Sequence, residues 1–216
     1  MRVDKIMELC ENLWKTIGLN LCFLLSNLPM LSFLLFLGIQ DIRNYPLFFC
    51  FCLLPTGASF SALFSCMLQW KKEKDLRVIY DYVKKYKNNF LQSMLVSMIQ
   101  CTFLYMLMKN IYFFDIYFKN FYGKLLFQIL LVLWVSMIPT FYIFVMRYHL
   151  TITNIIKNTF IFLLSRPLIL LGNMMAFLFV CMLYELFPAI IILGIGSIYS
   201  YLILSMNKIV FTIMEQ

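Results

Sequence analysis

The chain has 216 residues, of which 63% are hydrophobic and only 13% are charged, and its formal net charge is +8. A water-soluble domain needs a largely polar surface, so this composition excludes that class and indicates a membrane protein. A basic excess suggests nucleic-acid binding in a soluble protein. Here the basic residues flank apolar stretches, where they set the orientation of membrane spans, and we expect no nucleic-acid partner.

The chain opens with a mixture of acidic, basic and apolar residues, MRVDKIMELCENLWK, that contains no small-residue cleavage site. We interpret it as a retained amphipathic helix that leads into a first membrane span over residues 15–37. Within this span Asn20 and Asn27 lie seven residues apart, hence on one helical face, and Pro29 should kink the helix. An amide in hydrocarbon needs a partner. We favour a hydrogen bond between helices, and a polar contact with a partner protein or a ligand is the alternative.

The second span is predicted over residues 46–70. Gly57, Ser61 and Ser65 recur in it at intervals of four residues. Small residues at this spacing give a smooth helix face on which another backbone can rest. We favour packing within the chain, and an interface with another protein is the alternative.

Residues 71–90 predict a separate interfacial helix at the inner leaflet, because apolar and basic residues take opposite sides of it. Anionic headgroups attract such a segment by on the order of 1 kcal/mol per basic residue. The residues expected at the headgroups are Lys71, Lys72, Lys74, Arg77, Lys84, Lys85 and Lys87, together with Arg166 further along the chain.

In the rest of the chain, apolar stretches again alternate with more polar segments. This alternation predicts spans over residues 91–108, 124–146, 167–185 and 187–206, and a second, less charged interfacial helix over residues 147–166. A Pro-Thr pair begins at Pro55 and another at Pro139, each before an interfacial segment, which suggests an internal parallel repeat. The predicted fold is therefore all-α and polytopic, a single membrane domain over residues 1–216 with about six transmembrane helices.

The basic residues also predict the orientation. Fourteen of the eighteen lie on the side of the N-terminus in this arrangement, and only Arg43, Lys109, Lys119 and Lys124 lie on the other. Since cytoplasmic loops carry an excess of Lys and Arg, both termini should be cytoplasmic.

Residues that carry catalytic chemistry are scarce. His149 is the only histidine, no acidic residue lies in the middle of a predicted span, and there is no Gly-rich phosphate loop. Six of the seven cysteines fall in apolar stretches, where they are expected to act as small hydrophobic residues. We therefore expect no enzyme activity, no metal and no cofactor.

Several short motifs resemble those of the YesL-like bacterial membrane proteins. They are Leu19-Asn20 with Leu28-Pro29, Pro55-Thr56-Gly57-Ala58, Lys87-Asn88-Asn89-Phe90 and Ser165-Arg166-Pro167-Leu168. The resemblance covers nearly the whole chain, although Met30-Leu31-Ser32 departs from it. It implies a multi-pass protein of the bacterial cytoplasmic membrane that accompanies carbohydrate ABC importers.

From these observations we expect a non-catalytic accessory subunit that associates with the permease and ATPase subunits of a sugar importer. The expected contacts are Asn20, Asn27, Pro29, Gly57, Ser61 and Ser65. The alternative is a stand-alone, uncoupled transporter or channel for a small solute. Its path would be lined by Asn20, Asn27, Gln100, Gln128 and Asn173.

Overall fold

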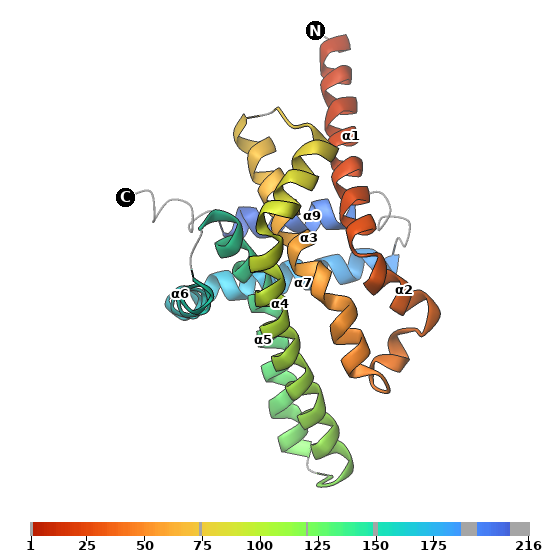
Figure 1. Cartoon of the computed structure of the whole chain (residues 1–216), viewed down its shortest axis with the longest axis vertical. Coiled ribbons are helices and arrows are strands. Elements are labelled where there is room, and N and C mark those ends of the chain that lie inside the picture. The colour runs from red at the N-terminus through yellow and green to blue at the C-terminus, as the bar shows by residue number, and fades with distance from the viewer. Residues whose placement is uncertain (1, 74, 120, 149–150, 187–193, 208–216) are drawn as a thin grey trace.

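The structure is a computed structural model, and it describes residues 2–73, 75–119, 121–148, 151–186 and 194–207. This part of the chain is helical and contains no β-strand. The elements are α1 (Arg2–Ser26), α2 (Leu28–Phe36), the 3-10 helix η1 (Ile39–Ile42), α3 (Pro46–Glu73), α4 (Val78–Ile116), α5 (Phe121–Arg147), α6 (Ile152–Ser165), α7 (Pro167–Leu186) and α9 (Ile195–Met206) (Figure 1).

Three of these helices, α3, α4 and α5, are long and apolar enough to cross a membrane. The pairs α1–α2 and α6–α7 pass the same test only when each bent pair counts as one span, which raises the number to five. The chain is therefore a helical membrane protein with three to five candidate spans among its described residues. The predicted sixth span over 187–206 lies partly outside them, and α9 has only 12 residues, where a span needs about 20.

The predicted kink of the first span is confirmed. α1 ends at Ser26, α2 begins at Leu28, and the two helices meet at an angle of 71°. Pro29 lacks the amide hydrogen that would continue the helix, and its ring would crowd the carbonyl four residues earlier. Asn27 lies at the break, where its side-chain amide donates to the Phe23 carbonyl oxygen at 2.8 Å.

The predicted separate interfacial helix over 71–90 is wrong. α3 continues to Glu73, and α4 then runs unbroken for 39 residues from Val78. No Gly or Pro occurs in α4 to end it. The amphipathic pattern is the beginning of this long helix, and the Arg77 backbone N–H donates to the Asp81 carboxylate at 2.9 Å at its start.

The corresponding segment in the second half of the chain does form a separate helix. α6 is a separate helix that meets α7 at 97°, with the break at Arg166 and Pro167. The residue before a proline is driven out of the α conformation, and Arg166 has φ −138° and ψ 72°. The two predicted repeat units therefore differ, because one contains a continuous helix where the other is bent.

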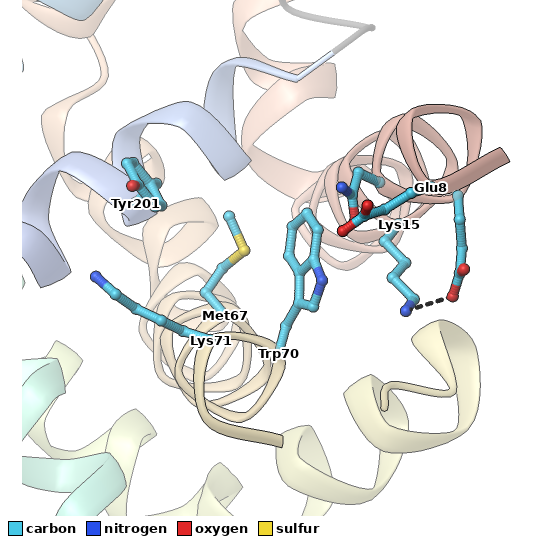
Figure 2. A pocket seen from close by; sticks show the side chains of 8 residues that line it. Glu8, Lys15, Met67, Trp70, Lys71 and Tyr201 are labelled. Atoms are coloured by element: carbon cyan, nitrogen blue, oxygen red, sulfur yellow. Dashed lines mark ion pairs between the residues drawn. The ribbon is translucent and has the colours of Figure 1, made fainter. Parts of the chain in front are cut away.

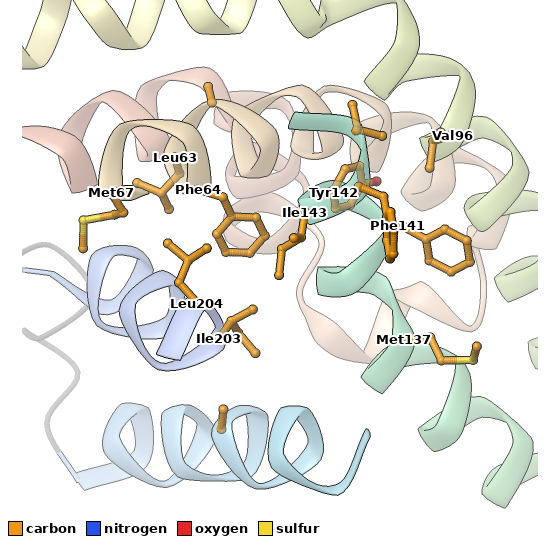
Figure 3. Packing of buried hydrophobic residues seen from close by; sticks show 14 of the residues in the cluster. Leu63, Phe64, Met67, Val96, Met137, Phe141, Tyr142, Ile143, Ile203 and Leu204 are labelled. Carbon is orange, nitrogen blue, oxygen red and sulfur yellow. The ribbon is translucent and has the colours of Figure 1, made fainter. Parts of the chain in front are cut away.

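α3 lies at the centre of the molecule and packs on α4, α5, α9 and α1. α4 and α5 continue beyond this body as a two-helix arm, and α7 and α9 run across the direction of the arm (Figure 1). The core collects side chains from α3, α5 and α9, with Phe64, Ile143 and Ile203 fully buried or nearly so (Figure 3). Helices in lipid associate mainly through such packing and through hydrogen bonds between them.

Candidate functional site

A buried polar network joins α3, α4 and α5 next to this core. The hydroxyls of Ser97 and Tyr142 lie 2.8 Å apart, and the Tyr142 hydroxyl donates to the Gln100 side-chain oxygen at 2.6 Å. One turn away, Ser93 donates to the Ser61 hydroxyl at 2.9 Å. All five side chains are buried, so the network satisfies polar groups that would otherwise be costly in the membrane.

Gly57 makes this close approach possible. A Cβ atom at this position would overlap the Ser97 hydroxyl and lie 2.6 Å from that of Tyr142. Ser61 is fully buried and Ser65 is half-buried on the same helix. The small-residue stripe thus packs inside the chain, which was the favoured interpretation, and Gly57 and Ser61 have no surface open to another protein.

A cavity of about 120 Å³ lies beside this network, lined by Ser97, Gln100 and Tyr142 and by apolar residues such as Phe60. The Gln100 side-chain nitrogen is buried and has no hydrogen-bond partner among the residues that the structure describes. The cavity is small and mostly apolar at its edges, so it offers space for a small molecule but not for a continuous path.

The amides of the first and fifth predicted spans serve other helix contacts. The Gly196 backbone N–H donates to the Asn20 side-chain oxygen at 2.9 Å, which joins α1 to α9. Asn173 on α7 donates to the Thr140 hydroxyl at 2.9 Å, and Asn207 donates to the Asn173 oxygen at 2.9 Å. Each of these amides is fully buried, in agreement with the favoured interpretation of Asn20.

The residues proposed for a transport path therefore do not gather in one place. Asn20, Gln100 and Asn173 belong to three separate clusters. Asn27 is buried at the α1–α2 break, and Gln128 is exposed on α5.

The residues predicted to contact the lipid headgroups differ in their surroundings. Lys71, Lys72, Arg77, Lys84 and Lys87 are exposed, and Arg166 is partly exposed. Lys74 lies outside the described residues, as does His149. Lys85 instead points toward α3, where its ammonium donates to the Ser65 carbonyl oxygen at 2.9 Å and to the Gln69 side-chain oxygen.

A larger polar cavity, of about 350 Å³, lies where α1, α3 and α9 meet. Its lining residues are Glu8, Glu11, Asn12, Lys15, Met67, Trp70, Lys71 and Tyr201. Lys15 pairs with Glu11 at 2.7 Å, and the Lys71 ammonium lies 5.2 Å from the centre of the Tyr201 ring. Figure 2 shows Trp70 and Met67 between this lysine and the polar residues of α1.

Of these residues, only Lys71 is among the site residues predicted from the sequence. The available signal was the amphipathic start of the chain, since Glu8, Glu11 and Lys15 share its polar face. The partner of that face could not be seen, because Tyr201 is more than 180 residues away in the sequence. In the part of the chain that the structure describes, no group of His, Cys, Asp and Glu is arranged to hold a metal ion.

A third cavity, of about 820 Å³, lies at the opposite end of the molecule between η1, α3, α4 and α5. Arg43 lies 4.9 Å from the centre of the Tyr112 ring, and Asp115 pairs with Lys124 at 2.7 Å. The first contact joins the loop after η1 to α4, and the second joins α4 to α5.

Comparison with known proteins gives one family. No curated protein and no solved structure matches the chain. The family model described as "Protein of unknown function, DUF624" matches residues 16–111, from the middle of α1 to near the end of α4. This is the family of the YesL-like proteins. The chain is similar to it over α3 and α4, which supply Gly57, Ser61, Ser97 and Gln100 to the polar network, but the match does not reach Tyr142 on α5.

Proposed function

We propose that this protein is a non-catalytic accessory subunit that associates, within the bacterial cytoplasmic membrane, with the permease subunits of a carbohydrate ABC importer. The arm formed by α4 and α5 is the proposed contact surface. The proposal includes six spans with both termini in the cytoplasm, and it leaves the internal repeat as a prediction.

The observation that carries the proposal is an exposed carboxamide without a hydrogen bond to the described residues, on a largely apolar arm. The outer faces of α4 and α5 expose large hydrophobic side chains, among them Leu95, Phe103 and Ile129. Gln128 is exposed among them, and its side chain makes no hydrogen bond to the described part of the chain. A carboxamide that faces lipid is costly, and it is stabilised when a second transmembrane protein supplies the hydrogen bond.

The kind of partner rests on the resemblance to the YesL-like proteins, which accompany carbohydrate importers. The chain itself lacks the cytoplasmic Glu-Ala-Ala and Gly loop through which permease subunits contact their ATPase. An accessory role beside such subunits is therefore preferred over a role as one of them.

The alternative, an uncoupled transporter, has less support. It needs polar side chains along one path, whereas the buried amides bind to neighbouring helices in separate clusters. Flux of a sugar through liposomes that contain only this protein would favour the alternative.

The test is a tagged pull-down from mild-detergent membranes of the native host, with an untagged control. We expect permease, ATPase and sugar-binding components in stoichiometric amounts with the wild type. Gln128→Leu should reduce their recovery by about tenfold, since a hydrogen bond to an otherwise unpartnered amide contributes roughly 1–2 kcal/mol. Thr102→Val is the matched control on α4, because the exposed Thr102 hydroxyl bonds only to the Met98 carbonyl oxygen of its own helix.

Two results would contradict the proposal. Recovery of this chain alone would remove the accessory role. Equal recovery with Gln128→Leu and wild type would remove this contact surface. Replacement of Gly57 and Ser61 by Leu is not a valid test of association, because both residues are buried against α4 and the variant would disrupt the fold.

A further inference from the structure

The cavity between α1, α3 and α9 has a lining that is typical of headgroup depth. Trp70 and Lys71 are in the last turns of α3, the apolar helix that ends at Glu73. Tyr201 on α9 lies on the same side of the cavity as Lys71, whose ammonium is 5.2 Å from the centre of its ring (Figure 2). Trp, Tyr and Lys together are typical of the membrane–water boundary, where aromatic rings and long basic side chains anchor a helix end.

The outer side of α1 is apolar at the same level. Ile6, Leu9, Leu13 and Trp14 are each more than half exposed, while Glu8, Glu11 and Lys15 face the cavity. In water such an apolar face would be covered by packing, and here no described part of the chain covers it. This arrangement is stable if α1 borders acyl chains, so the polar cavity opens beside lipid.

The charges in the cavity are balanced and separated. Its lining contains two carboxylates, Glu8 and Glu11, and two ammonium groups, Lys15 and Lys71. On α1, Lys15 pairs with Glu11 at 2.7 Å, and Glu8 is the second carboxylate of this wall. Lys71 lies on the far side of Trp70 and Met67, beside Tyr201 (Figure 2). A purely anionic headgroup gains little from such a lining, because Glu8 opposes it.

We propose that this cavity binds the headgroup of a zwitterionic phospholipid with a primary amine, of the phosphatidylethanolamine class. The ammonium would donate to Glu8, and the phosphate would accept from Lys71. A primary ammonium has three N–H donors for the carboxylates of α1, and charge-assisted hydrogen bonds of this kind are the stronger ones. The acyl chains would continue along the apolar outer side of α1. This inference is independent of the proposed importer partner.

The experiment uses the purified full chain in detergent, titrated with single lipids of identical acyl chains and read by native mass spectrometry. We expect phosphatidylethanolamine to bind about tenfold more tightly than phosphatidylglycerol. Phosphatidylcholine should lie between them, because its quaternary ammonium has no N–H to donate. Soluble glycerophosphoethanolamine, which has the same headgroup without chains, should bind far more weakly than the lipid.

Variants locate the site. Glu8→Gln should weaken binding of phosphatidylethanolamine by roughly tenfold, because the amine loses its charged acceptor. It should not weaken binding of phosphatidylglycerol, because the repulsion from Glu8 is removed as well. Lys71→Met should weaken both lipids, because both carry the phosphate. Lys72→Met is the matched control, since Lys72 is exposed on the same turn and does not line the cavity.

Three outcomes would overturn the proposal. Phosphatidylglycerol binding as tightly as phosphatidylethanolamine would exclude a site for the amine. Unchanged lipid binding in Glu8→Gln and Lys71→Met would exclude this cavity. Equal affinity for the soluble headgroup and the lipid would exclude a lipid ligand. Elution and helical content show whether each variant folds. If either does not, the three lipids are compared on the wild type and on a Glu8→Asp variant, and that comparison decides the question.

Discussion

At the scale of single residues, the close approach of α3 to α4 and α5 requires a residue without a Cβ atom at position 57. Gly57 faces the hydroxyls of Ser97 and Tyr142, and a Cβ at this position would overlap the first and lie 2.6 Å from the second. Gly57→Ala should therefore lower the free energy of unfolding by about 1–3 kcal/mol, which is typical of overpacking in a filled core. The thermal unfolding midpoint in detergent measures this loss.

The control for Gly57→Ala is Gly172→Ala on α7, where the nearest atoms belong to the flexible side chain of Met206 and little change is expected. In a Ser97→Ala background, Gly57→Ala should cost less, because the overlapping oxygen is gone. Equal costs in both backgrounds would show that the Ser97 hydroxyl is not the obstacle.

The type of contact at Gly57 could be predicted from the sequence, but its partner could not. The spacing of Gly57 and Ser61 indicates a close helix contact, since small residues at four-residue steps have this use in membranes. Nothing in the spacing says which helix approaches, because α4 and α5 carry many apolar side chains that fit equally well. The polar partners, Ser97 and Tyr142, lie 40 and 85 positions away and share no motif with Gly57.

At the scale of elements, Lys85 holds the hairpin of α3 and α4 together. Its ammonium donates to the Ser65 carbonyl oxygen and to the Gln69 side chain, so it is a structural residue and does not face the headgroups as predicted. Lys85→Met should lower the free energy of unfolding by roughly 1–3 kcal/mol, since hydrogen bonds from charged groups are among the stronger ones. Thermal unfolding in detergent is the measurement.

Lys84→Met provides the comparison, because Lys84 is exposed at the neighbouring position of the same helix. It should unfold at nearly the wild-type temperature. If both variants lose the same stability, the effect comes from the net charge of the segment and not from the bonds of Lys85.

Element ends were predictable only where a residue imposes them. Pro29 and Pro167 mark real breaks, because proline cannot continue a preceding helix without strain. The junction near residue 90 was misplaced, since the change from basic to apolar residues was taken as a change of element. A change from basic to apolar side chains does not end a helix as long as its backbone hydrogen bonds continue. α4 therefore continues past residue 90 without a break.

At the scale of the whole molecule, the all-helical class and the membrane setting follow from composition alone. The number of spans does not. α7 and α9 run across α4 and α5 (Figure 1), and hydropathy reports how apolar a helix is but not the direction in which it packs. At this scale, the distribution of basic residues predicts the orientation of the molecule in the membrane, which can be tested.

The start of α1 and the turn between α3 and α4 lie at one end of the molecule, and the turn between α4 and α5 lies at the other (Figure 1). The basic residues are concentrated at the first end, which predicts that this end is cytoplasmic. α4 has 39 residues, a length of roughly 58 Å at the usual rise of an α-helix. It is therefore long enough for its two ends to emerge on opposite sides of a hydrocarbon core about 30 Å thick, which we predict.

Single cysteines at the two ends test this orientation in a background without the exposed Cys10 and Cys181. A membrane-impermeant maleimide added to intact cells should label Lys119→Cys, which lies between α4 and α5, and should label Lys72→Cys only after the membrane is permeabilised. The reverse pattern would invert the orientation. Labelling of both residues in intact cells would mean that α4 does not cross the bilayer, and the cavity at Lys71 would then face the outside of the cell.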